Sequence, residues 1–205
     1  MTKSITYTLL ADGSSDEVLI SIINWAIVQH YPQVSFTPQF ASNLGKVGSN
    51  LTSRIPAALR AYPCDLLFVH RDAEAADHAV RLEEITLALS QAHSNFVPII
   101  PIRMTEAWLL SDEMAIREAA GNKMGTLKLG LPPKKRWEAL PNAKQVLFDA
   151  LTTASDKSGR ALKKFSPQKQ RARVAALTQD FSALRELSSF DYFESELNLK
   201  LRNIT

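Results

Sequence analysis

The fold is decided by residues 65–77, DLLFVHRDAEAAD, in which a short apolar run gives way abruptly to charged side chains. The run at residues 66–69 is brief and continuous, which is typical of a strand that is buried on both faces of a sheet. Similar segments stand at residues 5–11 (ITYTLLA) and 95–104 (NFVPIIPIRM), and residues 34–40 (VSFTPQF) form a shorter candidate. The sequence therefore predicts several short strands that end in polar turns.

The segments between these strands have helical patterns. Residues 18–31 (VLISIINWAIVQHY) are apolar on nearly every face, so we expect a well-buried helix there. Helices are also expected over residues 51–62, with Pro56 in the first turn, and over residues 75–93. This alternation predicts a mostly parallel, Rossmann-like α/β sheet that is flanked by helices and joined by right-handed crossovers.

The second part of the chain has a different character. Helical spacing continues over residues 105–121 and stops at a glycine, a natural C-cap, and no further strand is predicted. Later helices are expected at residues 143–154 and 167–187. We divide the chain into an α/β core, residues 1–122, and a basic, mainly helical C-terminal extension that packs on it, residues 123–205.

The distribution of charged residues divides the chain at the same place. Residues 1–122 hold 8 Lys/Arg and 13 Asp/Glu, residues 123–173 hold 13 and 3, and residues 174–205 hold 3 and 5. The three blocks thus carry net charges of −5, +10 and −2, within a total of +3. A basic block after an acidic one is typical of a polyanion-binding surface beside a cation-binding core, although a solvated basic surface has the same composition.

The remaining composition narrows the class of protein. Cys64 is the only cysteine, so an internal disulfide or a cysteine-based zinc site is excluded, and a reducing compartment fits best. No apolar run approaches a membrane span or a signal peptide, so we expect a cytoplasmic protein without a membrane partner. The sequence also lacks the patterns of a P-loop, a serine-hydrolase elbow, a zinc-protease helix and a dinucleotide-binding loop.

Acidic side chains follow two of the predicted strands. Asp12 comes after the first strand, and Asp72 and Glu74 come after the central one. Because the carboxyl ends of parallel strands meet at one edge of an open sheet, we expect these residues to lie close together. Carboxylates so close repel one another unless a cation or a proton lies between them. We therefore predict that Asp12, Asp72 and Glu74 bind Mg²⁺ or Mn²⁺, whose preferred ligands are oxygens.

Other polar residues near these strand ends have more ordinary explanations. Asp16 and Glu17 fall in the first turn of a helix, where acidic side chains interact favourably with the helix dipole, and Asp77 is expected on a helix surface. His70 stands at a strand end, where a metal ligand or base and a purely structural histidine are both open.

Arg103 and Glu106 follow the last predicted strand, at the same edge of the sheet. Arg103 is suited to binding a phosphate and Glu106 to contacting the metal, but a simple ion pair between them is the alternative. Trp108, nearby, is expected in the core or an interface.

These motifs resemble those of the Toprim domain. The segment ADGSSDE (11–17) supplies an acidic residue and a glycine after the first strand, and HRDAE (70–74) supplies a D-x-D-like element after a later one. The segments IRMTEAWLLSD (102–112) and SSFDYF (188–193) further resemble a small, sparsely characterised Toprim-like family that is found beside mobile-element and phage-defence genes.

The resemblance implies a Mg²⁺-dependent nuclease or related phosphodiester-acting enzyme, with Asp12, Asp72, Glu74 and Glu106 as the catalytic residues. Asp12 stands where Toprim domains normally have Glu. The second motif aligns either as His70-x-Asp72 or as Asp72-x-Glu74, and we prefer the latter because histidine is a poor ligand for magnesium.

Three hypotheses for function follow. The first is a metal-dependent nuclease in phage defence or a mobile element, with nucleic acid held by the basic extension. The second is a noncatalytic Toprim-like subunit that binds nucleic acid or a larger effector protein, which the altered acidic motifs favour. The third is an enzyme that acts on a small phosphorylated substrate. The residues expected to contact phosphates are Arg103, Lys134, Lys135, Arg136, Lys163, Lys164 and Arg171.

Overall fold

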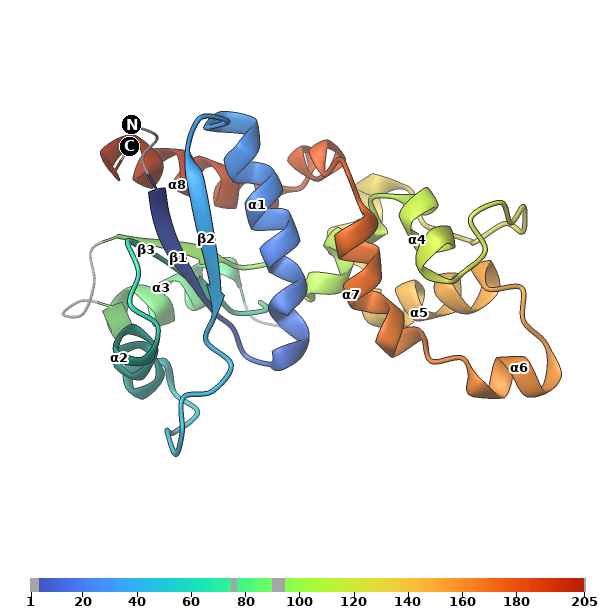
Figure 1. Cartoon of the computed structure of the whole chain (residues 1–205), viewed down its shortest axis with the longest axis horizontal. Coiled ribbons are helices and arrows are strands. Elements are labelled where there is room, and N and C mark those ends of the chain that lie inside the picture. Colours follow the sequence, from blue (N-terminus) through green and yellow to red (C-terminus); the bar gives the residue numbers. More distant parts are fainter. Residues whose placement is uncertain (1–3, 75–76, 90–94, 205) are drawn as a thin grey trace.

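The computed structural model describes residues 4–74, 77–89 and 95–204. Within them the chain forms an α/β fold around a four-stranded, all-parallel sheet with strand order β2-β1-β3-β4 (Figure 1). The prediction of a mostly parallel sheet flanked by helices is therefore confirmed. The strands are β1 (Ser4–Leu10), β2 (Ser35–Phe40), β3 (Leu66–His70) and β4 (Phe96–Ile99).

Strands β1 and β3 lie at the centre of the sheet, and β2 lies at an edge. Tyr7 is paired with Leu66 and Leu10 with Val69 in the register between β1 and β3, and every residue of β3 is buried. β2 contains Pro38, which has no N–H to donate and is therefore tolerated at an edge.

Helices cover both faces of the sheet. Side chains alternate along β1, so Tyr7 and Leu9 join the apolar cluster on one face, whereas Leu10 joins the cluster on the other. The first cluster includes residues of α1 (Leu19–His30) and α8 (Ser188–Ile204), and the second includes residues of α2 (Leu51–Ala61) and α3 (His78–Leu89).

The remaining helices form a lobe beside the sheet (Figure 1). α4 lies before the predicted boundary at residue 122, but it packs in this lobe against α5 and α7. α8, which follows the lobe in the sequence, returns to the sheet beside β4. The lobe helices are α4 (Glu113–Ala119), α5 (Ala143–Ala154), α6 (Gly159–Lys164) and α7 (Pro167–Leu177). Short 3₁₀ helices are η1 (Ser14–Val18), η2 (Thr105–Leu110), η3 (Lys134–Ala139) and η4 (Ser182–Glu186).

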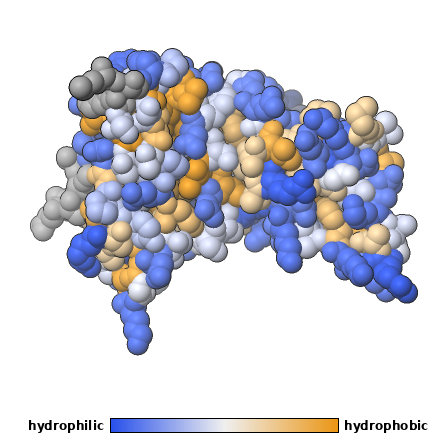
Figure 2. Space-filling model, in the orientation of Figure 1, coloured by the Kyte–Doolittle hydropathy of each residue, from blue (hydrophilic) through white to orange (hydrophobic). Residues whose placement is uncertain are grey.

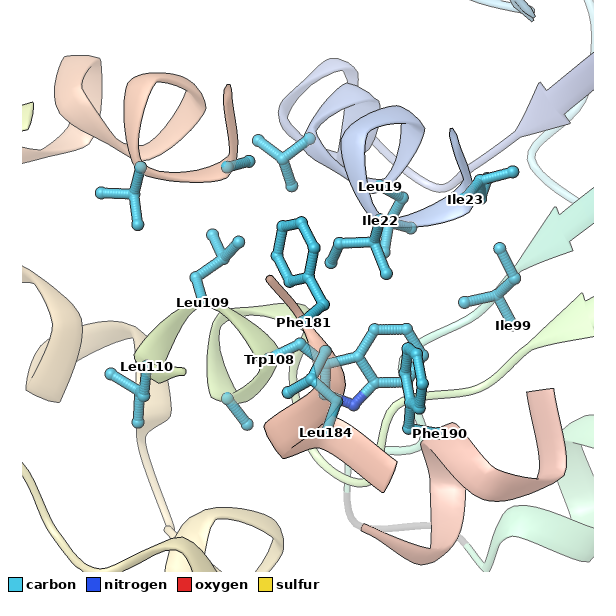
Figure 3. Packing of buried hydrophobic residues seen from close by; sticks show 14 of the residues in the cluster. Leu19, Ile22, Ile23, Ile99, Trp108, Leu109, Leu110, Phe181, Leu184 and Phe190 are labelled. Atoms are coloured by element: carbon cyan, nitrogen blue, oxygen red, sulfur yellow. The ribbon is translucent and has the colours of Figure 1, made fainter. Parts of the chain in front are cut away.

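Trp108 joins the lobe to the sheet (Figure 3). Its ring centroid lies 5.3 Å from that of Phe190 and 6.0 Å from that of Phe193, and its Nε1 donates a hydrogen bond to Ser189 Oγ at 3.3 Å. The side chain is almost fully buried, as expected from the sequence. Because Trp108 belongs to η2, this packing fixes the segment that also carries Glu106.

Helix limits differ from the predictions where a proline or a cap intervenes. Pro56 is the sixth residue of α2 rather than in its first turn, so α2 lacks the hydrogen bond that an N–H there would donate to Thr52. The helix expected over residues 105–121 divides in two, because the Asp112 side chain caps α4 by accepting from Ala115 N at 3.0 Å.

The limits of other helices agree more closely with the predicted ranges. α5 covers the residues expected for it, and Gly121 follows α4 with a φ of 81°, as its predicted role in the C-cap requires. The helix expected over residues 167–187 ends at Leu177, and η4 follows it. α3 lies inside the range expected for residues 75–93, and the ends of that range fall partly outside the described residues.

No helix in the part of the chain that the structure describes combines the length and the apolar character that a bilayer-spanning helix needs.

Candidate functional site

The candidate site lies at the carboxyl ends of the central strands. The strand order places β2 beyond β1 on one side and β4 beyond β3 on the other, so the topology reverses between β1 and β3. Ligands of open α/β sheets bind outside the carboxyl ends of the strands at such a switch point. Asp12 follows β1 and Asp72 follows β3, so both lie at this edge.

Asp12 is bound by Arg54 and Arg71, two arginines that the sequence patterns did not indicate. Its Oδ1 lies 3.0 Å from Arg71 Nη1 and 3.5 Å from Arg54 Nη1. Arg54 also donates to the carbonyl oxygen of Ala11, and Arg71 Nη2 lies 3.2 Å from Glu84 Oε1. The charge of Asp12 is thus balanced by guanidinium groups from α2 and from the loop after β3.

Asp72 is fixed by the start of η2. Its Oδ1 accepts hydrogen bonds from Thr105 N at 2.9 Å and from the Thr105 hydroxyl at 3.1 Å, and it lies 3.2 Å from His70 Nε2. The Thr105 hydroxyl lies 3.0 Å from the same nitrogen of His70. These contacts hold the loop after β4 against the end of β3.

His70 lies at the centre of the acidic cluster. Burial lowers its pKa, but the hydrogen bond and charge of Asp72, followed by the charges of Asp16 and Asp12, outweigh burial and raise the pKa above its ordinary value. Its Nδ1 is buried 3.7 Å from Asp16 Oδ2 and has no hydrogen-bond partner in the part of the chain that the structure describes. His70 therefore lies between Asp16 on one side of its ring and Asp72 on the other.

Asp16 has a larger role than its helix position indicated. Its Oδ2 accepts a hydrogen bond from Gly13 N at 3.0 Å, which is the capping contact expected at the start of η1. The side chain is also buried, and its Oδ1 lies 3.6 Å from Arg171 Nη2. Asp16 therefore belongs to the acidic cluster, which the local sequence pattern did not indicate.

Arg171 reaches this cluster from the inner face of α7. Its Nη1 donates to Glu106 Oε1 and its Nη2 to the carbonyl oxygen of Ser15. The side chains of Arg171 and Glu106 are only 7% and 5% exposed. The interpretation of Arg171 as a surface phosphate contact therefore needs correction, because this arginine forms a buried ion pair, and Glu106 is paired with it rather than with Arg103.

Glu74 and Arg103 lie on adjacent loops of the site. The Glu74 side chain is 71% exposed, and its Oε2 lies 4.0 Å from Arg81 Nη2. Both residues have a positive φ, 54° for Glu74 and 68° for Arg103, which costs a non-glycine residue about 1–2 kcal/mol. The hydrogen bond from Glu74 N to Arg103 O, at 3.2 Å, joins the two loops and stabilises this conformation. Backbone strain of this kind clusters at functional sites.

The structure does not bring Asp12, Asp72 and Glu74 together as one set of metal ligands. Among the described residues, no three His, Cys, Asp or Glu side chains are arranged to hold one metal ion. Three arginines lie beside Asp12 and Asp16 instead, and His70 contacts Asp16 and Asp72. The oxygen donors of Asp12 and Asp72 still fit Mg²⁺ chemically, because this ion commonly takes one or two carboxylates and fills its shell with water and substrate phosphates.

Comparisons with known proteins give no further information about the site. No family model, no curated protein and no solved structure matches the chain. The resemblance to Toprim domains therefore rests on the sequence motifs alone.

The other predicted phosphate contacts of the extension, unlike Arg171, form none of the ion pairs of the acidic cluster. Lys163 and Lys164 are exposed in the last turn of α6, at the outer end of the lobe, where Figure 2 shows mainly hydrophilic residues. Lys135 and Arg136 are exposed in η3, whereas Lys134 is partly buried beside Glu186, 2.5 Å from its Oε1.

A cavity of about 210 Å³ opens between η1 and α7, on the lobe side of the acidic cluster.

Proposed function

We propose that this chain is a Toprim-like, Mg²⁺- or Mn²⁺-dependent enzyme that cleaves phosphodiester bonds in nucleic acid. The observation that carries the proposal is the acidic cluster at the switch point of a parallel sheet, next to a helical lobe with exposed basic residues. The resemblance of residues 102–112 and 188–193 extends the proposal to a cytoplasmic role in phage defence or a mobile element.

The chain's own residues have distinct tasks in this proposal. Asp72 is held by Thr105 in one orientation, and Asp12, 38% exposed, lies where a substrate can reach it. The exposed lysines of α6 attract the backbone and do not read its sequence. When bound, the metal ion supplies charge stabilisation at the phosphoryl oxygens and an activated water. Glu106, buried against Arg171, positions α7 rather than touching substrate.

The test is cleavage of labelled DNA and RNA with Mg²⁺, Mn²⁺ or EDTA. Asp72→Asn keeps the oxygen that accepts from Thr105 but removes the charge, so we expect at least about a hundredfold loss of cleavage without loss of the fold. Asp149→Asn, an exposed carboxylate of α5, is the matched control and should cleave like wild type. Cleavage that persists in EDTA, or that is unchanged in Asp72→Asn, would refute the proposal.

One observation favours a second candidate, a noncatalytic subunit that binds nucleic acid or a larger effector protein. Asp12 and Asp16 already lie beside Arg54, Arg71 and Arg171, and Asp72 accepts hydrogen bonds from Thr105, so these carboxylates have partners without an ion. Nucleic-acid binding that is independent of metal, with no turnover under any ion, would support this candidate over the enzyme.

A further inference from the structure

Two arginines converge on one acceptor at the mouth of the site. Arg54 of α2 and Arg71 after β3 both place Nη1 near Asp12 Oδ1, at 3.5 Å and 3.0 Å. Their side chains are only 16% and 19% exposed, whereas Asp12 is 38% exposed and lies toward solvent. Paired guanidinium groups around one oxygen anion are also the arrangement that binds a phosphate.

Both guanidinium groups are held by partners other than Asp12. Arg54 donates to the carbonyl oxygen of Ala11, and Arg71 Nη2 lies 3.2 Å from Glu84 Oε1. Glu84 is itself held by Arg81 Nη1, at 2.9 Å. If the Asp12 side chain moves away, these contacts keep the two arginines in place, so the site is preorganised for another anion.

Arg71 also has unused capacity as a donor. Among the described residues its Nε has no hydrogen-bond partner, although it is buried and the two Nη atoms are engaged by Asp12 and Glu84. A phosphate has more acceptor oxygens than a carboxylate and satisfies a cluster of guanidinium donors more completely. The structure thus contains an anion site in which the protein's own carboxylate is an imperfect occupant.

We propose that Arg54 and Arg71 bind a phosphate group of the substrate, and that Asp12 occupies this anion site when substrate is absent. The inference rests on the proposed function for the identity of the ligand as nucleic acid, but not for catalysis. Asp12 and the phosphate therefore compete for the same two arginines. Removing the Asp12 charge is therefore expected to tighten phosphate binding. A purely structural role of Asp12, or a metal-ligating role in the absence of metal, predicts no such gain in affinity.

The experiment measures binding in EDTA by fluorescence anisotropy, with a short oligonucleotide that carries fluorescein at its 3′ end and either a phosphate or a hydroxyl at its 5′ end. Asp12→Asn is expected to bind about three- to tenfold more tightly than wild type, and Arg71→Ala about tenfold more weakly. An effect on both probes assigns the site to the backbone, and an effect on the phosphorylated probe alone assigns it to a terminal phosphate.

Two controls separate this site from general charge effects. Glu17→Gln removes an exposed acidic charge near the same edge, and Arg60→Ala removes an exposed arginine from the other end of α2. The proposal fails if Asp12→Asn tightens binding no more than Glu17→Gln does, whatever the arginine variants do. It also fails if folded Arg54→Ala and Arg71→Ala bind like Arg60→Ala. Circular dichroism reports folding, and Asp12→Asn carries the test if an arginine variant does not fold.

These outcomes are independent of cleavage. A protein that never cleaves nucleic acid but shows the expected pattern refutes the proposed enzyme and keeps the phosphate site. Cleavage without the expected binding pattern keeps the proposed enzyme and refutes the phosphate site.

Discussion

The ion pair between Arg171 and Glu106 gives the sharpest test of how the lobe is attached to the core. The two side chains are 7% and 5% exposed, so solvent screens their interaction little. Arg171→Met leaves the carboxylate of Glu106 buried without its cation, which is expected to cost about 3–5 kcal/mol of unfolding free energy. For a chain of 205 residues this corresponds to a fall in Tm of about 6–20 °C.

The assay is urea unfolding followed by the fluorescence of the three tryptophans. The double variant Arg171→Met with Glu106→Leu removes both charges of this pair. We expect it to regain part of the lost stability, because apolar pairs often replace buried ion pairs without net cost, whereas Asp16 and Ser15 O still lack Arg171. A loss below about 1 kcal/mol in the single variant would show that the pair behaves like a surface ion pair. A double variant less stable than the single one would equally refute the reasoning.

Three further outcomes are expected. Trp108→Ala should lower the unfolding free energy by about 3–5 kcal/mol in the same urea assay, and a loss below about 1 kcal/mol would contradict its place in the core. Burial raises the pKa of Glu194, but hydrogen bonds from Arg185 outweigh it and leave the pKa below its ordinary value. The stabilisation is therefore complete above the unfolded-state pKa and is lost as pH falls through the folded-state pKa, so the deficit of Glu194→Gln should shrink between about pH 7 and pH 3.5. Replacing Lys163 and Lys164 by alanine should reduce the slope of log K against log salt by about 1.5–2, and an unchanged slope would remove them from the interface.

The fold was accessible from the sequence because its signals are local. The continuous apolar run of β3 and the polar turns after each strand were enough to predict a parallel sheet and its edge. Asp12 and Asp72 were placed at that edge by the same reasoning. Each of these inferences needs only a few consecutive residues and the general geometry of parallel sheets.

The partners of the carboxylates were not accessible, because they come from distant segments. Arg54 reaches Asp12 from α2, and Arg171 reaches Asp16 from α7, so no local pattern links either pair. The local pattern therefore predicted a metal ion as the balancing charge, whereas arginines lie beside Asp12 and Asp16 in the structure. Asp16 looked like an ordinary capping residue for the same reason, since its capping contact is local and its other contacts are not.

The return of α8 to the sheet determines the order in which the chain can fold during synthesis. Phe190 and Phe193 pack on Trp108, and Phe193 also contacts Phe68 of β3. The ribosome therefore has to synthesise the whole lobe before α8 can cover its part of this face of the sheet, beside α1. Such a long-range contact slows folding and leaves apolar side chains of this face exposed on the nascent chain until α8 is synthesised.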